Sequence, residues 1–259
     1  MQISVGSWNI GGAILGKSHQ RNGQPSLHYY IDLIEAERPD ILCLQEAHEF
    51  VDGTPGQAIQ IAKAAGFAHC VSQRLSRSHL ADDAWLSIAT LSRFPISDTR
   101  FRLFPRFELE AVGPDFRPWK LHDKGYIVSR VQLEGDIELD VLNAHCFPLH
   151  RFRTAATKAS FRPVWQMLRN ELFGLSQRNS VAAMDLNYPE PETLLGDSLG
   201  EGSFSLAFRS PTKPSGAQHD FILSSESLKI IGDRVLPTRS DHSYCMADFQ
   251  IRNARSAAS

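Results

Sequence analysis

DILCLQE, residues 40–46, sets an unbroken apolar run directly before a carboxylate. A short continuous run of this kind is typical of a strand buried on both faces. The segment before it predicts a helix over 26–38, because its apolar residues recur at helical spacing and Pro39 ends it. IELDVLNAH (137–145) and SVAAMDLN (180–187) repeat the order of apolar run and polar end. Rigid strand ends can hold side chains that meet a substrate, so these stretches indicate the fold class and the site together.

The rest of the chain alternates strands with a few helices. A second helix is expected with Thr54 as its N-cap, Pro55 at its first position and Gly66 beyond its end. Residues 151–177 are expected to be partly helical, with Pro163 starting or kinking the second half. Further strands are expected at 2–9, 85–91, 93–97 (broken by Pro95), 126–133, 204–208, 219–224, 228–235 and 244–251.

The connections favour one domain of mixed topology. Gly135 lies in a short turn between the strands 126–133 and 137–144, which predicts a hairpin and a partly antiparallel sheet. The sequence contains no Ser/Gly/Pro linker, so we expect a single α/β domain over 1–251 and a flexible tail over 252–259.

Composition bounds the function. The 259 residues carry 27 basic and 29 acidic side chains, and 42% are hydrophobic, which excludes a disordered or fibrous chain and argues against non-specific coating of nucleic acid. Four cysteines without CxxC spacing argue against a zinc site. The sequence has no secretory signal and no apolar run long enough to span a bilayer, so we expect a cytoplasmic protein without stable membrane insertion and without an obligate protein partner.

Seven short motifs combine polar residues with strand ends. Each is a weak signal by itself, because an Asn or Asp at a strand end is usually a turn former. Together, and in this order, they resemble the motif series of the endonuclease/exonuclease/phosphatase superfamily, which includes DNase I-like nucleases, AP endonucleases, deadenylases, neutral sphingomyelinases and inositol polyphosphate 5-phosphatases. The motifs are WNIGG (8–12), LQEAH (44–48), LSRFPI (91–96), LNAHCFP (142–148), AMDLNYP (183–189), QHDFIL (218–223) and SDHSYCMADF (240–249).

The resemblance implies a fold and a chemistry. The fold is a four-layer α/β sandwich of two packed mixed β-sheets flanked by helices. The chemistry is hydrolysis of phosphate esters with Mg²⁺, or with Mn²⁺ in its place. By the same resemblance Glu46 is the principal metal ligand, Asn9 is the amide beside it, and Asp241 faces the metal site. Hard oxygen donors of this type are what Mg²⁺ requires.

The resemblance also assigns the acid–base groups. His242 is expected to pair with Asp220, which would fix its tautomer and stabilise its charged form. Asp185 is expected to orient or deprotonate the attacking water, and Asn187 to donate to a phosphate oxygen. His145 is expected to contact the phosphate or assist the leaving group.

The substrate-binding candidates are less sharply defined. Residues 145–178 contain six basic residues and one acidic residue, and Arg151 and Arg153 follow His145 closely. They suit a phosphodiester or polyphosphate, although a solvated helix face gives the same pattern. Trp119 lies in PDFRPWKLHDK (114–124), where it can stack on a base or belong to the core.

Three functions remain open from the sequence. The first is a Mg²⁺-dependent phosphodiesterase or nuclease with nucleic acid as its expected substrate. The second is a hydrolase of small-molecule or lipid phosphoesters, favoured by the near-neutral charge and by the lack of DNA-gripping insertions. PEPETLLG (189–196) lacks the basic residue that AP endonucleases often carry there, which argues against an abasic-site enzyme. The third is an inactive binding protein on the same fold, disfavoured because no motif is lost. Met184 and Phe221 depart from the usual residues of their motifs and leave the acidic residues in place.

Overall fold

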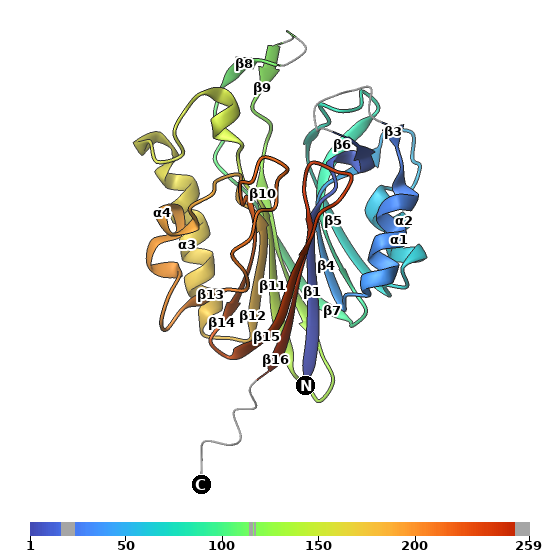
Figure 1. Ribbon diagram of the computed structural model, residues 1–259, viewed down its shortest axis with the longest axis vertical. Coiled ribbons are helices and arrows are strands. Elements are labelled where there is room, and N and C mark those ends of the chain that lie inside the picture. The colour runs from blue at the N-terminus through green and yellow to red at the C-terminus, as the bar shows by residue number, and fades with distance from the viewer. Residues whose placement is uncertain (17–23, 114–115, 117, 252–259) are drawn as a thin grey trace.

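Two six-stranded sheets pack face to face in the computed structural model, which describes residues 1–16, 24–113, 116 and 118–251 (Figure 1). In each sheet one pair of neighbouring strands is parallel, β1 with β4 and β11 with β12, and the remaining pairs are antiparallel. The first sheet consists, in order, of β15 (Leu228–Leu236), β16 (Tyr244–Ile251), β1 (Gln2–Asn9), β4 (Ile41–Phe50), β6 (Ala84–Ser92) and β5 (His69–Arg77). The second consists of β13 (Phe204–Leu206), β14 (Asp220–Ser225), β12 (Ser180–Asp185), β11 (Glu138–His145), β10 (Gly125–Gln132) and β7 (Ile96–Leu103).

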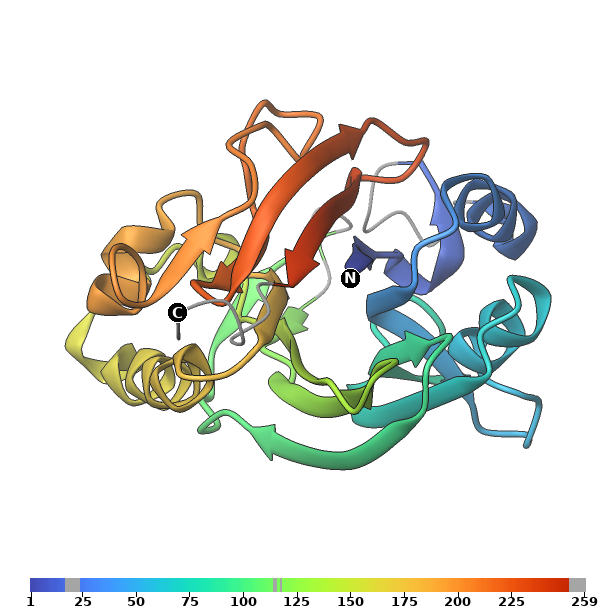
Figure 2. The same ribbon diagram turned by 90° about the horizontal axis from the view of Figure 1, so that it is seen from below.

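Helices cover the outer face of each sheet, so the predicted four-layer sandwich is confirmed. Seen from below, α1 and α2 lie outside the first sheet and α3 and α4 outside the second (Figure 2). The helices are α1 (Leu27–Glu37), α2 (Gln57–Ala64), α3 (Arg162–Ser176) and α4 (Pro191–Leu195). Two further strand pairs lie outside the two large sheets, β2 (Ile14–Leu15) with β3 (Gln24–Pro25), and β8 (Glu110–Val112) with β9 (Pro118–Lys120).

The continuous apolar runs are explained by burial on both faces. Along β4, Ile41 and Cys43 point into the core between the sheets, whereas Leu42 and Leu44 point toward the helices α1 and α2. Successive strand side chains point to opposite faces, so a strand with a core on each side needs an apolar residue at every position. β12 follows the same rule, with alternate residues in the inter-sheet core and in the core beneath α3.

A buried amide pair ties the sheets together near the site. Gln45 of β4 donates from Nε2 to Oδ1 of Asn143 in β11 at 2.8 Å, and Asn143 donates from Nδ2 to the carbonyl oxygen of Ala89 in β6 at 2.8 Å. Both amides are completely buried. A hydrogen bond at this depth is directional, so it fixes the relative position of the two strand ends as apolar packing alone would not.

The second helix begins later than predicted. Thr54 is not its N-cap: α2 starts at Gln57, with Gly56 as the N-cap residue. The backbone N–H of Thr54 instead donates to Oδ1 of Asp52 at 2.9 Å in a local turn. Gln57 accepts from the N–H of His48 at 2.8 Å and donates to the carbonyl oxygen of Gly12 at 2.7 Å. These long-range contacts set the start of the helix.

Other boundaries differ for local reasons. Pro163 lies in the first turn of α3, where its missing N–H costs nothing, so it starts the helix. The strand expected at 93–97 is wrong as placed, because β7 begins at Ile96, after Pro95, and runs to Leu103. The strand β5 and the β8–β9 hairpin were not predicted, and the predicted tail 252–259 lies outside the described residues.

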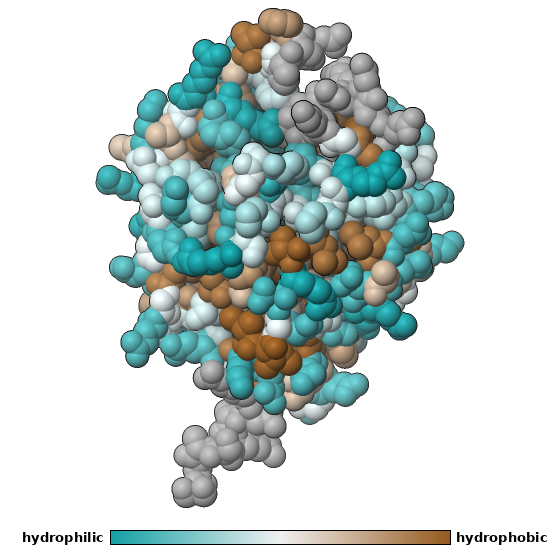
Figure 3. Space-filling model, in the orientation of Figure 1, coloured by the Kyte–Doolittle hydropathy of each residue, from teal (hydrophilic) through white to brown (hydrophobic). Residues whose placement is uncertain are grey.

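Hydrophilic residues cover most of the face in Figure 3, and apolar residues form several separate patches. Within the described ranges, no helix combines the length and the apolar character needed to cross a bilayer.

Candidate active site

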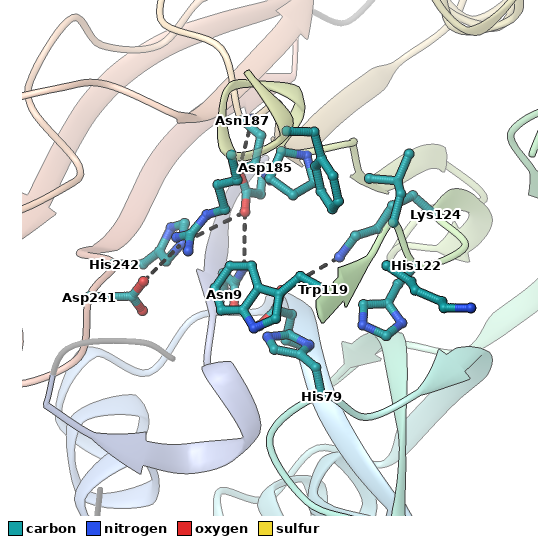
Figure 4. Close-up of a pocket in the computed structure, with 15 residues that line it drawn as sticks. Asn9, His79, Trp119, His122, Lys124, Asp185, Asn187, Asp241 and His242 are labelled. Carbon is teal, nitrogen blue, oxygen red and sulfur yellow. Dashed lines mark hydrogen bonds and ion pairs between the residues drawn. The ribbon is translucent and has the colours of Figure 1, made fainter. Parts of the chain in front are cut away.

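One pocket collects most of the predicted site residues at the edge where β1, β11 and β12 end (Figure 4). Its walls come from both sheets, from the hairpin strand β9 and from the turn after β11. Eight of the predicted residues line it, namely Asn9, Glu46, Trp119, Arg151, Asp185, Asn187, Asp241 and His242. His145 and Asp220 are buried and contact members of this group. Arg153, which is exposed, is outside the lining as far as the described residues show.

Glu46 reaches the pocket because β4 bulges at this residue. The pairing of β4 with β6 shifts register between Gln45 and Ala47, and Glu46 has a φ of +55°. A left-handed conformation costs a residue with a side chain on the order of 1–3 kcal/mol, and such strain concentrates at functional sites. The bulge takes Glu46 out of the regular alternation and places its carboxylate in the pocket wall.

Asp185 is held by both sheets. Asn9, at the end of β1, donates from Nδ2 to Oδ2 of Asp185 at 2.9 Å, and the backbone N–H of Asn187 donates to Oδ1 at 2.9 Å. Asn9 is itself oriented by the N–H of Gly11, which donates to its Oδ1 at 3.1 Å. Complete burial raises the pKa of Asp185 to about 6, against the lowering effect of nearby His242. A carboxylate with this pKa can accept a proton near neutral pH.

His242 and Asp220 form a buried pair. Nδ1 of His242 lies 2.9 and 3.0 Å from the two carboxylate oxygens of Asp220. Burial alone would lower the pKa of His242, but the charges of Asp220, Asp241 and Asp185 outweigh it and raise the pKa to about 9. The imidazole is therefore charged at neutral pH. Its Nε2 lies 3.8 Å from Oδ2 of Asp185, on the pocket side.

The ligand atoms of Asp185, Asp220 and His242 lie within 4.8 Å of one another. Asp220 takes up Nδ1 of His242, so Nε2 is the ring nitrogen on the pocket side. Glu46 and Asp241 also line the pocket, and their carboxylates are further donors for a divalent ion. A set of carboxylate oxygens fits Mg²⁺ or Mn²⁺ and not a softer ion.

Lys124 is one of the site residues that sequence reasoning missed, together with His79 and His122 of the pocket lining. Its Nζ lies 3.0 Å from Nε2 and 3.1 Å from Nδ1 of His145, and 3.5 Å from Oε1 of Glu46. Burial holds the pKa of Lys124 below its ordinary value, against the raising effect of Glu46 and Asp185. Burial and the neighbouring Lys124 hold the pKa of His145 well below its usual value, so a neutral imidazole accepts from the ammonium.

The sequence does contain a signal for Lys124. It directly precedes β10, and Gly125, the first residue of that strand, pairs with His145 of β11. The predicted hairpin between 126–133 and 137–144 carries this register, so the backbone of residue 124 is expected next to the strand end that carries the histidine.

Aromatic rings form the outer wall of the pocket. Trp119 of β9 is half-buried, and the guanidinium carbon of Arg151 lies 5.8 Å from its ring centroid. His79 and His122 stack at 5.2 Å, and His79 meets Trp119 edge-on at 6.3 Å. Burial lowers the pKa of His79 to about 4 and also lowers that of His122, so both rings are uncharged and available for stacking at neutral pH.

Comparison with known proteins identifies the family. The family model described as "Endonuclease/Exonuclease/phosphatase family" matches residues 6–242. The chain therefore belongs to the endonuclease/exonuclease/phosphatase family, a family of phosphoesterases. Among curated proteins, none matches the chain by sequence.

Solved structures share the fold at low sequence identity. An endonuclease/exonuclease/phosphatase from Beutenbergia cavernae has a TM-score of 0.73 at 18% identity, over 98% of this chain and 72% of its own. The human nocturnin catalytic domain with bound sulfate has a TM-score of 0.65 at 18% identity, over 96% and 93%. ANGEL2, a 2′,3′-cyclic phosphatase in complex with adenosine-2′,3′-vanadate, has a TM-score of 0.62 at 15% identity, over 98% and 96%.

Proposed function

We propose that this protein is a Mg²⁺-dependent phosphodiesterase that hydrolyses phosphoester bonds in nucleic acid, with Mn²⁺ able to replace Mg²⁺. The observation that carries the proposal is the meeting, in one pocket, of a carboxylate with a pKa near 6, a charged imidazole, and two further carboxylates suited to a divalent ion. Hydrolysis of a phosphate ester uses each of these groups: a base that takes a proton from water, cations that bind the phosphate oxygens, and ligands that hold the metal ion.

Asp185 is the base in this proposal. Asn9 and the N–H of Asn187 fix both of its oxygens, so it can take a proton from an attacking water without reorienting. Charged His242, anchored by Asp220, donates from Nε2 to a phosphate oxygen and stabilises the charge that builds up there. A divalent ion bound at Glu46 and Asp241 would supply further charge neutralisation.

Lys124 is the second fixed cation for the phosphate. His145 is neutral and lies against Lys124. We therefore propose that His145 holds the ammonium of Lys124 toward the pocket and does not contact the substrate directly. The side chain of Asn187 donates from Nδ2 to the carbonyl oxygen of Cys146 at 3.1 Å, which fixes the turn after β12 at the pocket wall.

The aromatic wall supports a nucleotide substrate. Trp119 offers a ring for a base, and Arg151 carries a charge beside it for a phosphate. The bound adenosine-2′,3′-vanadate of ANGEL2 and the bound sulfate of nocturnin belong to those proteins, and they support the choice of a nucleoside phosphate or similar anion here. Arg153 is proposed only as an outer contact for a longer substrate, because it is exposed.

The pocket has a volume of about 50 Å³, which favours a small-molecule phosphoester as the second candidate. At 10–15 Å³ for each water this is room for roughly four waters, about the size of a phosphate group. A chain end or a small ester can present such a group.

One substrate panel tests both candidates. EDTA-treated protein is incubated with Mg²⁺ and end-labelled single-stranded DNA, RNA, plasmid, bis-p-nitrophenyl phosphate, p-nitrophenyl phosphate, sphingomyelin and inositol phosphates. We expect cleavage of a single-stranded polynucleotide that EDTA abolishes and Mg²⁺ restores. Cleavage of small esters alone would select the second candidate, and activity resistant to EDTA would reject the metal model. E46Q is the matched control for contaminating nuclease.

A further inference from the structure

Lys213 contacts Asp241, one of the two proposed metal donors. Its Nζ lies 2.8 Å from Oδ2 of Asp241, in an ion pair whose side chains are 11% and 14% exposed. Asp241 lines the pocket, and within the described lining Lys213 does not appear. The ammonium is therefore placed to act on the carboxylate of Asp241, and its charge also reaches Asp185 and His242.

The segment that carries Lys213 is anchored to the catalytic pair. Oγ1 of Thr212, which is completely buried, accepts from the N–H groups of His219 at 2.9 Å and Asp220 at 3.1 Å. The N–H of Ser243 donates to the carbonyl oxygen of Thr212 at 2.8 Å. Thr212 thus links the start of β14 to the residue after His242, and Lys213 follows it directly.

A reverse turn fixes the lysine further. The N–H of Lys213 donates to the carbonyl oxygen of Ala217, and the N–H of Gly216 donates to the carbonyl oxygen of Lys213, both at 3.0 Å. Gly216 has a φ of +86°, which a residue with a side chain adopts only with strain. With its backbone held on both sides, Lys213 loses little freedom when its ammonium pairs with Asp241.

An ammonium at hydrogen-bond distance cancels most of the charge that makes Asp241 attractive to a divalent ion. The pair is nearly out of water, where charges interact more strongly than at the surface. A cation that binds Asp241 must therefore displace the ammonium or share the carboxylate with it. Glu46 has its own lysine, Lys124, but at the longer distance of 3.5 Å.

We infer that Lys213 is a positioning residue that competes with divalent ions for Asp241 and so lowers the affinity of the site for its metal. The inference rests on the proposed function, since it takes Glu46 and Asp241 as the metal donors. Lysine suits this role because its ammonium is a compact charge that one carboxylate oxygen can satisfy.

Mn²⁺ binding tests the inference without any substrate. EDTA-treated protein is titrated with Mn²⁺, and free Mn²⁺ is counted by electron paramagnetic resonance. We expect K213M and K213Q to bind at least tenfold more tightly than wild type, and K213R to bind as wild type. K229M is the charge-matched control, because Lys229 is exposed and lies at the start of β15, whereas Asp241 follows the end of that strand. Unchanged or weaker binding in both K213M and K213Q would overturn the inference.

Two further variants locate the effect. In a D241N background K213M should change Mn²⁺ affinity less than twofold, because the carboxylate through which Lys213 acts is gone. A tenfold gain that persists there would contradict action through Asp241. E46Q separates the failures: Mn²⁺ binding that E46Q weakens but K213M leaves unchanged rejects the role of Lys213 alone, whereas binding that E46Q does not affect rejects the metal site itself.

Discussion

The floor of the pocket (Asn9, Asp185, Asp220 and His242) and its rim (His79, Trp119, His122 and Arg151) are held in different ways. Every floor residue is at most 5% exposed and makes a hydrogen bond of 2.9–3.0 Å to another strand or loop. The rim residues meet one another through rings and a guanidinium at centroid distances of 5.2–6.3 Å. Directional bonds fix atoms for chemistry, whereas ring contacts leave room for adjustment. The floor should therefore set the rate and the rim the substrate.

The largest effects should follow from two carboxylates of the pocket, Asp185 at the floor and Glu46 beside it. Glu46→Gln and Asp185→Asn remove a charge without changing shape, so each should lower kcat by at least about a thousandfold while the fold survives. Single-turnover kinetics with Mg²⁺, with circular dichroism as the fold control, measures this. A variant that keeps more than a tenth of wild-type activity would remove that residue from the proposed catalytic groups.

The pairing of His242 with Asp220 predicts a dependence of stability on pH. The folded pKa of His242 is raised to about 9, above its ordinary 6.5, so its charge stabilises the metal-free protein fully below pH 6.5. This contribution, on the order of 3 kcal/mol at most, is lost as the pH rises through 9.

Asp220→Asn removes the main partner of that charge. The variant should show a flatter free energy of unfolding between pH 6.5 and 9, and activity lowered about a hundredfold, as weakening of a donor that stabilises the developing charge implies. Urea unfolding at several pH values, without metal, gives the comparison. If the slope of the variant equals that of wild type, Asp220 does not hold the charge of His242.

The floor was easier to predict from sequence than the rim, for a physical reason. Asp185 ends an apolar run, and a buried strand fixes where its last side chain lies. Glu46 also follows an apolar run, but it lies within β4 and reaches the pocket through the bulge, which the sequence pattern did not predict. Trp119 belongs to a hairpin with no apolar pattern of its own, so nothing local indicated that its ring meets Arg151. Lys213 is placed by hydrogen bonds to Ala217 and by its neighbour Thr212, which no periodicity encodes.

Contacts between residues distant in sequence also limited the prediction of one helix boundary. The start of α2 depends on Gln57 bonding to Gly12, which is distant in sequence, and a local capping signal at Thr54 pointed elsewhere. Lys124 was partly predictable. When the register of the predicted hairpin is extended to the start of β10, the backbone of Lys124 comes next to the end of β11, where His145 lies.

Trp119→Ala sharpens the contrast at the rim. Loss of a stacking ring should raise KM for a single-stranded polynucleotide about tenfold, since stacking on one base is worth about 1–3 kcal/mol. The kcat should change less than threefold, because no floor bond involves the ring. Trp119→Phe should recover most of the affinity. Equal losses for the polynucleotide and for bis-p-nitrophenyl phosphate would mean that the ring supports the pocket and does not read a base.

The smallest effect separates two arginines that are neighbours in sequence. Arg151 lines the pocket, and burial lowers its pKa while Glu46, Asp241 and Asp185 raise it, so its charge is felt at the floor. Arg153 is exposed, and its charge is screened by salt. Arg151→Gln should therefore lower kcat/KM about tenfold, as loss of a charge-assisted bond implies, and Arg153→Gln by less than twofold.

Measuring kcat/KM of both variants at 50 and 200 mM salt makes the comparison sharper. The deficit of Arg151→Gln should persist at high salt, whereas any deficit of Arg153→Gln should vanish. A larger loss at Arg153 would show that a longer substrate leaves the pocket over this turn, and the boundary of the rim would then have to include it.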